Sequence, residues 1–258
     1  MVIKRDVIYK PAGKPRTLHI WLPDDYEAPE NAEERYPVMY FFDGHNLFSD
    51  EDATYGKCWG MADWLRSCPK PFIIVGIECG HEGRERLNEY SPYDHHGGFL
   101  GEIHGMGDMT LRWIAEDIKP MIDREYRTWP EREATGIGGS SMGGLMSLYA
   151  AARWGHVFTK CACVSSAIIG TMERDACTAV MPTDMRVYLS WGTEEAGGTR
   201  EDPADDLLSP AARRNIHIAE SMRKHGAETM TYCQRGGHHC EADWEKQVPV
   251  FMDFLWLR

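Results

Sequence analysis

The sequence predicts an α/β fold with a mainly parallel central sheet, an antiparallel pair of strands at its N-terminal edge, and helices on both faces. Residues 2–9 and 17–22 alternate apolar with polar side chains, which is typical of strands with one buried face. Residues 37–42 and 71–77 are continuously apolar, which is typical of strands buried on both faces of a parallel sheet. Strand-like and helix-like segments then alternate to the C-terminus, as crossover connections between parallel strands require.

The remaining elements follow from local signals. Residues 59–66 can form a short helix between the two apolar runs, and residues 108–126 have helical spacing with a kink expected at Pro120. Ser209 before Pro210 is typical of a helix start, and Gly226 is typical of the end of that helix. The other predicted elements are strands at residues 134–139, 162–165, 185–191 and 229–234, and helices at residues 143–152 and 241–257, the last with a break at Pro249.

No linker, internal repeat or shift in composition divides the chain, so we expect a single domain over residues 1–258. One segment departs from the regular pattern. Residues 80–107 contain seven glycines and four histidines with little periodicity. Loops of this length usually form lids or substrate-binding segments, or contain short elements that a sequence pattern does not reveal.

Composition excludes several classes of partner. The formal net charge of −12 and the lack of any Lys/Arg cluster argue against nucleic acid. No apolar run approaches the roughly 20 residues that span a bilayer, so no membrane partner is expected. The first residues carry no secretory signal, and the eight cysteines lack CxxC or zinc-finger spacing. We therefore expect a cytoplasmic protein with reduced thiols, no metal and no cofactor. Homo-oligomer formation stays open.

A nucleophile motif spans residues 139–143, which read G-x-S-x-G with Ser141 at the centre. In this motif glycines permit a sharp turn from strand to helix that exposes the serine. The flanking pattern fits, because a predicted strand precedes the motif and a helix-forming run follows it. Ser140 is excluded as the central serine because Met142 would then occupy a position that needs a small residue. The helix start beside Ser141 would also supply N–H donors for an oxyanion.

A serine nucleophile needs an imidazole base and a carboxylate that orients it. Where this elbow occurs, the acid and then the histidine come later in the chain. His217 and His225 lie in a predicted helix, whereas His238 and His239 lie on the loop after the last predicted strand. For the acid, Glu194 and Glu195 follow the strand at 185–191, so either carboxylate would emerge at the carboxyl edge of the sheet.

The sequence resembles the Putative esterase family of α/β-hydrolases in four strings of residues. These are DGHNLF at 43–48, YRT at 126–128, GGSSMGGLMSLY at 138–149, and GHHCE at 237–241 together with Trp244. The family includes feruloyl and acetylxylan esterases, S-formylglutathione hydrolases, enterochelin esterases and mycolyltransferases. The resemblance runs from about residue 36 to the C-terminus and implies the α/β-hydrolase fold.

Position by position, the resemblance implies that Ser141 is the nucleophile and that His239, rather than His238, is the base. The acid falls on Glu195, where a glutamate stands in place of the usual aspartate, and Glu194 stays open as its substitute. A further departure is Cys240, which occupies a position where Asn is common.

The resemblance also implies the oxyanion donors, which are the backbone N–H groups of Met142 and His45. The implied reaction is acyl transfer through an acyl-enzyme that water hydrolyses. An acylated carbohydrate, carrying a feruloyl or acetyl group, or a small carboxylic ester is the first substrate prediction. A siderophore trilactone and S-formylglutathione are the alternatives. An alternative of another class is a non-catalytic module that binds carbohydrate or a partner.

Overall fold

The computed structural model describes residues 1–97, 101–195 and 209–258. By its internal contacts the chain divides into an N-terminal unit, Met1–Gly136, and a C-terminal unit, Ile137–Arg258. The expectation of a single domain stays a prediction. Among the described residues, no helix is both long enough and apolar enough to cross a lipid bilayer.

The strands of the N-terminal unit lie in the order β1-β2-β4-β3. The antiparallel edge predicted from the alternating pattern is confirmed, because β1 pairs antiparallel with β2 and β2 pairs antiparallel with β4. Strands β3 and β4 pair in parallel and are buried along their whole length, as their continuous apolar sequences predict. The bounds are β1 (Val2–Tyr9), β2 (Lys14–Trp21), β3 (Val38–Phe42) and β4 (Ile73–Ile77).

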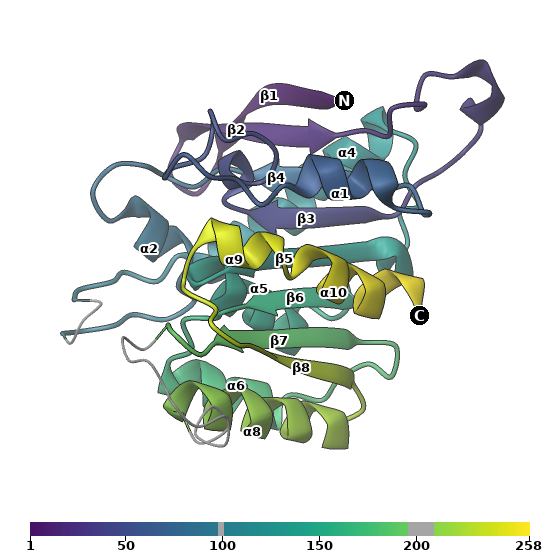
Figure 1. The fold of residues 1–258 in the computed structure, drawn as a ribbon. Helices are drawn as coiled ribbons and strands as arrows, with labels where there is room; N and C mark the ends of the chain where they lie inside the picture. The colour runs from purple at the N-terminus through teal and green to yellow at the C-terminus, as the bar shows by residue number, and fades with distance from the viewer. Residues whose placement is uncertain (98–100, 196–208) are drawn as a thin grey trace. The chain divides into compact units, whose positions relative to one another are not determined.

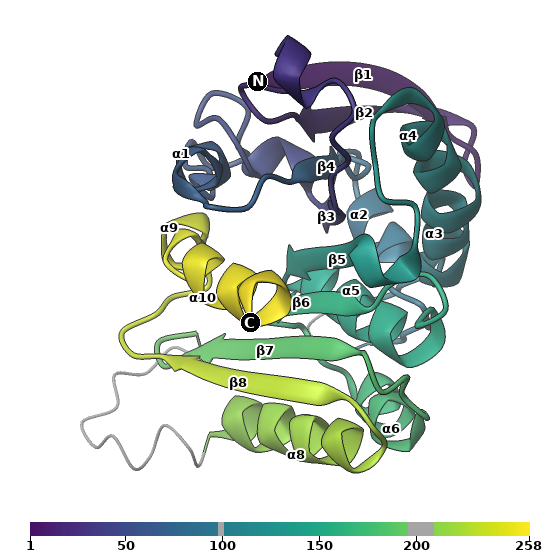
Figure 2. The same cartoon turned by 90° about the vertical axis from the view of Figure 1, so that its right-hand side faces the viewer.

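Helices lie on both faces of these strands, with α1 on one face and α3 and α4 on the other (Figure 1; Figure 2). The predicted kink at Pro120 takes the form of a π-helical turn, η3, directly before the proline, which lies in the first turn of α4. The bounds are η1 (Pro29–Asn31), η2 (Gly44–Asn46), α1 (Met61–Ser67), α2 (Glu85–Glu89), α3 (Gly107–Trp113), η3 (Ile114–Ile118), α4 (Lys119–Glu125) and η4 (Arg132–Ala134).

The glycine- and histidine-rich segment at residues 80–107 contains short elements. Helix α2 lies within it, and His95 forms an isolated antiparallel bridge with Ile103. The sequence pattern did not predict α2, because five residues are too few to show a helical period.

The strands of the C-terminal unit lie in the order β5-β6-β7-β8. Strand β6 pairs in parallel with β7, and β7 pairs in parallel with β8. Parallel pairing brings the C-terminal ends of β6, β7 and β8 to one edge, and a loop follows each of these three strands there. The bounds are β5 (Thr135–Ser140), β6 (Lys160–Val164), β7 (Arg186–Gly192) and β8 (Glu228–Gln234).

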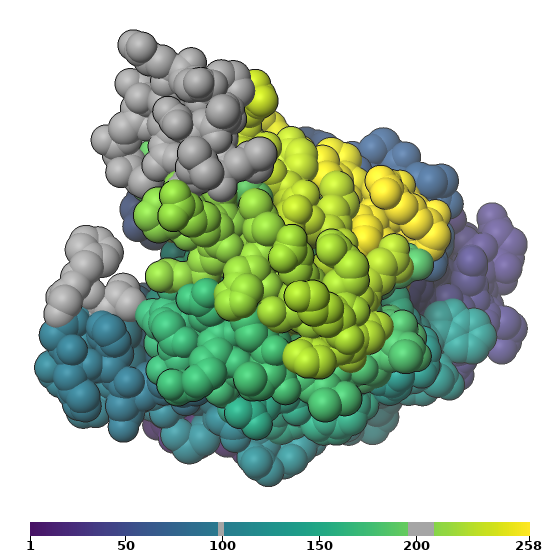
Figure 3. Space-filling view, turned by 90° about the horizontal axis from the view of Figure 1, so that it is seen from below, coloured from purple at the N-terminus to yellow at the C-terminus, as the bar shows by residue number. Residues whose placement is uncertain are grey.

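Helices α5 and α6 cover one face of these strands, and α9 and α10 cover the other (Figure 1; Figure 2). Helix α8 lies on the surface seen in Figure 3. As predicted, Ser209 caps α8, since its hydroxyl accepts a hydrogen bond from the N–H of Ala212 at 3.0 Å. The bounds are α5 (Met142–Arg153), α6 (Gly170–Thr178), α8 (Pro210–Lys224), α9 (Glu241–Glu245), α10 (Val248–Met252) and the π-helical η5 (Asp253–Leu257).

Candidate active site

Ser141 lies on a strained turn between β5 and α5. Its φ and ψ angles are 57° and −117°, a conformation that residues other than glycine rarely adopt. The chain also approaches itself closely here, because a Cβ atom added to Gly139 would lie 2.9 Å from the carbonyl carbon of Gly143. A glycine at residue 139 is therefore needed for the turn, which is the geometry that the G-x-S-x-G spacing predicts.

Backbone hydrogen bonds hold this turn against the end of β6. The N–H of Ser141 donates to the carbonyl oxygen of Val164 at 3.0 Å. The carbonyl oxygen of Ser141 accepts from the N–H groups of Leu145 at 3.0 Å and Ala167 at 2.9 Å. The side chain of Ser141 is partly exposed, and its hydroxyl makes no hydrogen bond within the part of the chain that the structure describes. The backbone is thus fixed while the hydroxyl is available.

The N-terminus of α5 follows Ser141 directly. No side chain caps this twelve-residue helix, and the N–H of Met142 makes no hydrogen bond to any described residue. A helix start combines free N–H groups with the positive end of the helix dipole. The position predicted for an oxyanion donor therefore carries an unpaired donor.

Glu195 and His239 lie together after the ends of β7 and β8. The Glu195 Oε2 atom is 3.4 Å from the Nδ1 atom of His239. The other oxygen of Glu195, Oε1, accepts a hydrogen bond from the N–H of Gly192 at 3.0 Å, which fixes the carboxylate. A carboxylate at Nδ1 leaves the Nε2 atom of the imidazole to exchange a proton with a nucleophile.

The two loops that carry this pair lie against each other. A Cβ atom on Gly192 would lie 2.2 Å from the carbonyl oxygen of Gly237, so only glycine fits at residue 192. The N–H of Glu194 donates to that same carbonyl at 2.9 Å, and the N–H of Thr193 donates to the carbonyl oxygen of Gln234 at 3.1 Å. These contacts between the backbones set the separation of the acid and the imidazole.

Trp244 links His239 to the neighbourhood of Ser141. The indole and the imidazole pack edge to face, with ring centroids 5.0 Å apart. The indole N–H of Trp244 donates to Ser165 Oγ at 3.1 Å. Ser165 directly follows Val164, whose carbonyl oxygen accepts the hydrogen bond from the N–H of Ser141. No hydrogen bond joins Ser141 Oγ to His239 among the described residues. Such hydrogen bonds often form only when substrate is bound.

The neighbouring histidine, His238, faces a different carboxylate. Its Nδ1 atom lies 3.3 Å from Asp243 Oδ2, and its backbone N–H donates to the same oxygen at 2.7 Å. Lys246 donates to the other carboxylate oxygen of Asp243 at 2.6 Å. Asp243 thus anchors the loop that carries His239, a role that the sequence pattern did not indicate.

The pKa of Asp243 is lowered. Burial alone would raise it, but the Lys246 ammonium and the His238 N–H outweigh that effect. A carboxyl whose pKa is lower when folded stabilises the protein above its unfolded pKa, near 3.9, and this stabilisation is lost as the pH falls through the folded pKa.

We therefore expect Asp243→Asn to reduce the free energy of unfolding at pH 7 by about 1 kcal/mol. The difference from the wild type should be smaller at pH 3 than at pH 7, because below the unfolded pKa the unfolded wild-type chain takes up a proton that the folded carboxylate resists. Urea denaturation at both pH values measures this. Asp253→Asn, which removes an exposed pair with Arg258, is the control and should change little. A difference that stays equal at both pH values would contradict the interpretation.

The remaining predicted site residue, His45, lies in the N-terminal unit on the turn η2 after β3. Asp43 starts this turn at φ 57°, its N–H donates to the hydroxyl of Tyr90 at 3.0 Å, and Arg86 binds both of its carboxylate oxygens at 2.8 Å. Burial raises the pKa of Asp43, but the Arg86 charge outweighs it and the net pKa is lowered. The backbone N–H of His45 makes no hydrogen bond within the described ranges.

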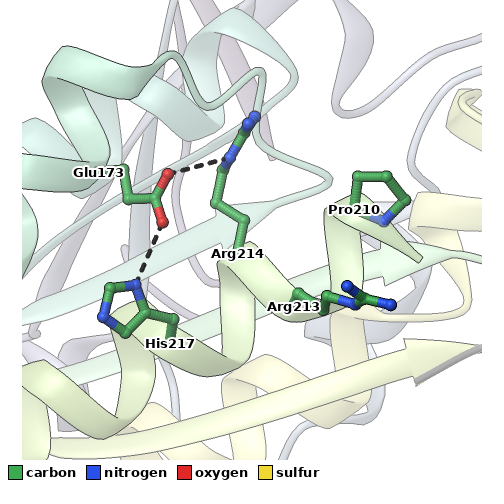
Figure 4. Close-up of a pocket in the computed structure, with 5 residues that line it drawn as sticks. All are labelled: Glu173, Pro210, Arg213, Arg214 and His217. Carbon is green, nitrogen blue, oxygen red and sulfur yellow. Dashed lines mark hydrogen bonds and ion pairs between the residues drawn. The ribbon is translucent and has the colours of Figure 1, made fainter. Parts of the chain in front are cut away.

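A surface hollow of about 700 Å³ lies by α6 and α8 (Figure 4). Within it, Glu173 pairs with Arg214 at 3.2 Å and with Nδ1 of His217 at 3.1 Å. His217 is thus a surface histidine of α8 in an ion-pair network. None of the candidate catalytic residues is among the described residues that line this hollow, which are Glu173, Pro210, Arg213, Arg214 and His217.

Comparison with known proteins gives a match to the family described as "Putative esterase" over residues 10–254. An uncharacterized protein of Bacillus subtilis, YbbA, is 25% identical over 248 residues, which cover 93% of this chain and 92% of YbbA. Esterase Rv1288 of Mycobacterium tuberculosis is 31% identical over 54% of this chain and 26% of its own length. Ferri-bacillibactin esterase BesA of Bacillus subtilis is 29% identical over 52% of this chain and 47% of its own length.

Solved structures show the same fold. An IroE-like serine hydrolase from Shewanella oneidensis superposes with a TM-score of 0.73 at 17% identity, covering 99% of this chain and 79% of that one. Siderophore hydrolase EstA from Aspergillus nidulans gives a TM-score of 0.70 at 16% identity, covering 98% and 94%. These likenesses confirm the predicted α/β-hydrolase fold.

Proposed function

The chain belongs to the Putative esterase family, and from this premise we propose that Ser141, His239 and Glu195 form the catalytic triad of a serine ester hydrolase. Membership of the family makes the protein an esterase. The observation that carries the proposed triad is the contact of 3.4 Å between Glu195 and His239 Nδ1, on the loops that follow β7 and β8. The strained turn at Ser141, with its free hydroxyl, supports the nucleophile.

In the proposed reaction, His239 removes the hydroxyl proton of Ser141 as the oxygen attacks the ester carbonyl. The C–O bond to the alcohol then breaks, and the alcohol leaves with the proton from His239. Water repeats the cycle on the acyl-enzyme and releases the acid. Glu195 holds the imidazole in the required tautomer. We further propose that the unpaired N–H of Met142 binds the oxyanion, and the N–H of His45 stays a prediction as the second donor.

The choice between Glu195 and Glu194 gives a direct test of the acid. Glu195→Gln should lower kcat by about 10³-fold, because the amide no longer stabilises the imidazolium or fixes its tautomer. Glu194→Gln should leave kcat nearly unchanged, since Glu194 lies beside Thr193 Oγ1 at 3.5 Å and forms no ion pair with a histidine in the described part of the chain. Steady-state hydrolysis of p-nitrophenyl acetate measures both. A larger loss in Glu194→Gln would move the acid to that residue.

The proposed substrate is a carboxylic ester of one of two classes. The resemblance to BesA favours an ester-linked siderophore. An acylated carbohydrate is the second candidate, supported by the residues shared with a family that includes feruloyl and acetylxylan esterases. We also propose that the enzyme works in the cytoplasm, because all eight cysteines are free thiols.

A panel of esters separates the substrate classes. Values of kcat/KM on enterobactin, methyl ferulate, acetylated xylan and S-formylglutathione should be highest for the siderophore ester. The Ser141→Ala variant serves as the blank for each substrate. A clear preference for methyl ferulate or acetylated xylan would instead select the carbohydrate class, and equally slow hydrolysis of all four would contradict both.

A further inference from the structure

We propose that His45, Cys79 and His81 form a binding site for a zinc ion in the N-terminal unit. Their candidate ligand atoms all lie within 4.8 Å of one another. Thiolate and imidazole are both ligand types that zinc binds, and three protein ligands leave a fourth position for water. The site uses the ring of His45, whose backbone N–H is a predicted oxyanion donor, and its test measures metal binding rather than ester hydrolysis. The proposal departs from the prediction of no metal that was made from the sequence. The sequence did not suggest this site, because the separation of residue 45 from residues 79 and 81 matches no zinc-finger pattern.

His45 supplies the strongest evidence. The residue is 6% exposed, and its Nε2 atom lies 2.9 Å from the hydroxyl of Thr54. Its Nδ1 atom is buried and has no hydrogen-bond partner among the described residues. A buried polar atom without a partner is costly, and a metal ion would satisfy it. If Nε2 carries the proton and donates it to Thr54, the lone pair of Nδ1 is free for the ion.

The ring of His81 lies beside that of His45. The two imidazoles pack edge to face, with ring centroids 4.9 Å apart. Two of the three donors are therefore already side by side.

Cys79 follows β4 and is 2% exposed. Burial, together with the Asp43 carboxylate, raises the pKa of its thiol. The thiol must lose its proton to bind zinc, so the S–H bond breaks, a Zn–S bond forms, and the proton passes to the solvent. Affinity should therefore fall as the pH is lowered.

His81 completes the set and provides access from the solvent, because 57% of its side chain is exposed. Glu78 lies beside it, with 3.7 Å between Glu78 Oε2 and His81 Nε2, and its other oxygen lies 2.7 Å from His19 Nε2. Burial raises the pKa of Glu78, but the hydrogen bond from His19 outweighs it, so the carboxylate is ionised. Carboxylates beside ligating histidines orient the ring and balance the charge of the metal.

Titration of the purified, metal-free full chain with Co²⁺ tests the site, because a cobalt–thiolate bond gives a charge-transfer absorption band. We expect one Co²⁺ per chain, displaced by Zn²⁺, and no such band in Cys79→Ser. His81→Ala should lower the Zn²⁺ affinity by roughly 100-fold or more, and Glu78→Gln by about 10- to 100-fold. Since the His81 side chain is exposed, His81→Ala should fold even if Cys79→Ser does not.

Two matched variants serve as controls. Cys68→Ser replaces a half-buried cysteine of the same unit, and His225→Ala replaces an exposed histidine at the end of α8. Both should retain the cobalt spectrum and the Zn²⁺ affinity of the wild type. The proposal is wrong if the wild type gives no thiolate band, if the band persists in folded Cys79→Ser, or if His81→Ala binds Zn²⁺ no more weakly than His225→Ala does.

Discussion

Replacing Ser141 by alanine is expected to lower kcat for hydrolysis of p-nitrophenyl acetate by a factor on the order of 10⁵. The nucleophilic oxygen is then absent, so the only catalysis left comes from oxyanion donors and binding. The fold should be unaffected, because alanine replaces serine at the same strained φ of 57° and Ser141 Oγ makes no hydrogen bond within the described ranges. A hydrolysis assay with p-nitrophenyl acetate measures the activity of each variant, and its circular dichroism spectrum shows whether it is folded.

Ser140 provides a matched control for this variant. It is the preceding residue, it ends β5, and only 5% of it is exposed. Ser140→Ala should keep kcat within a small factor of the wild type. If Ser140→Ala loses activity while Ser141→Ala retains it, the frame of the nucleophile motif is wrong.

His239→Ala is expected to lower kcat by about 10⁴- to 10⁶-fold, since the variant has no base to take the serine proton and no acid to protonate the leaving alcohol. The KM for the same ester should change far less than kcat, because the imidazole acts mainly in the transition state. Comparing kcat and KM with those of the wild type checks this expectation.

His238→Ala is the matched control, since the two histidines are adjacent and face different carboxylates. His238 is 66% exposed, and its backbone N–H, rather than its ring alone, holds the loop on Asp243. The variant should retain most of the activity. A greater loss in His238→Ala than in His239→Ala would overturn the assignment of the base.

The sequence predicts elements well where the local pattern is strong. The alternation of residues 2–9 gives the bounds of β1 without error, and Ser209 with Pro210 gives the start of α8. Helix α6 was missed because it turns only Met172 and Ala176 into the core, too few apolar residues to show a period. Helix α2 was missed because it is short.

In the candidate site, too, some residues can be predicted from the local sequence and others depend on tertiary packing. The spacing of the glycines predicts Ser141 as the nucleophile, because the constraint is local to the turn. Local pattern alone does not separate Glu195 from Glu194. The contact of Glu195 with His239 that favours Glu195 depends on the close approach of Gly192 to Gly237, which are far apart in the chain. Asp243 and the contacts of Trp244 with His239 and Ser165 depend on the same kind of tertiary packing.

Labelling with a fluorophosphonate, followed by peptide mass spectrometry, tests the identity of the nucleophile most directly. Such reagents form a covalent bond with an activated serine oxygen and expel fluoride. We expect one phosphonyl group per chain, on Ser141, with no labelling of Ser141→Ala and far slower labelling of His239→Ala. A phosphonyl group on Ser140 or on another serine, or continued ester hydrolysis by a chain that carries the label on Ser141, would contradict the account.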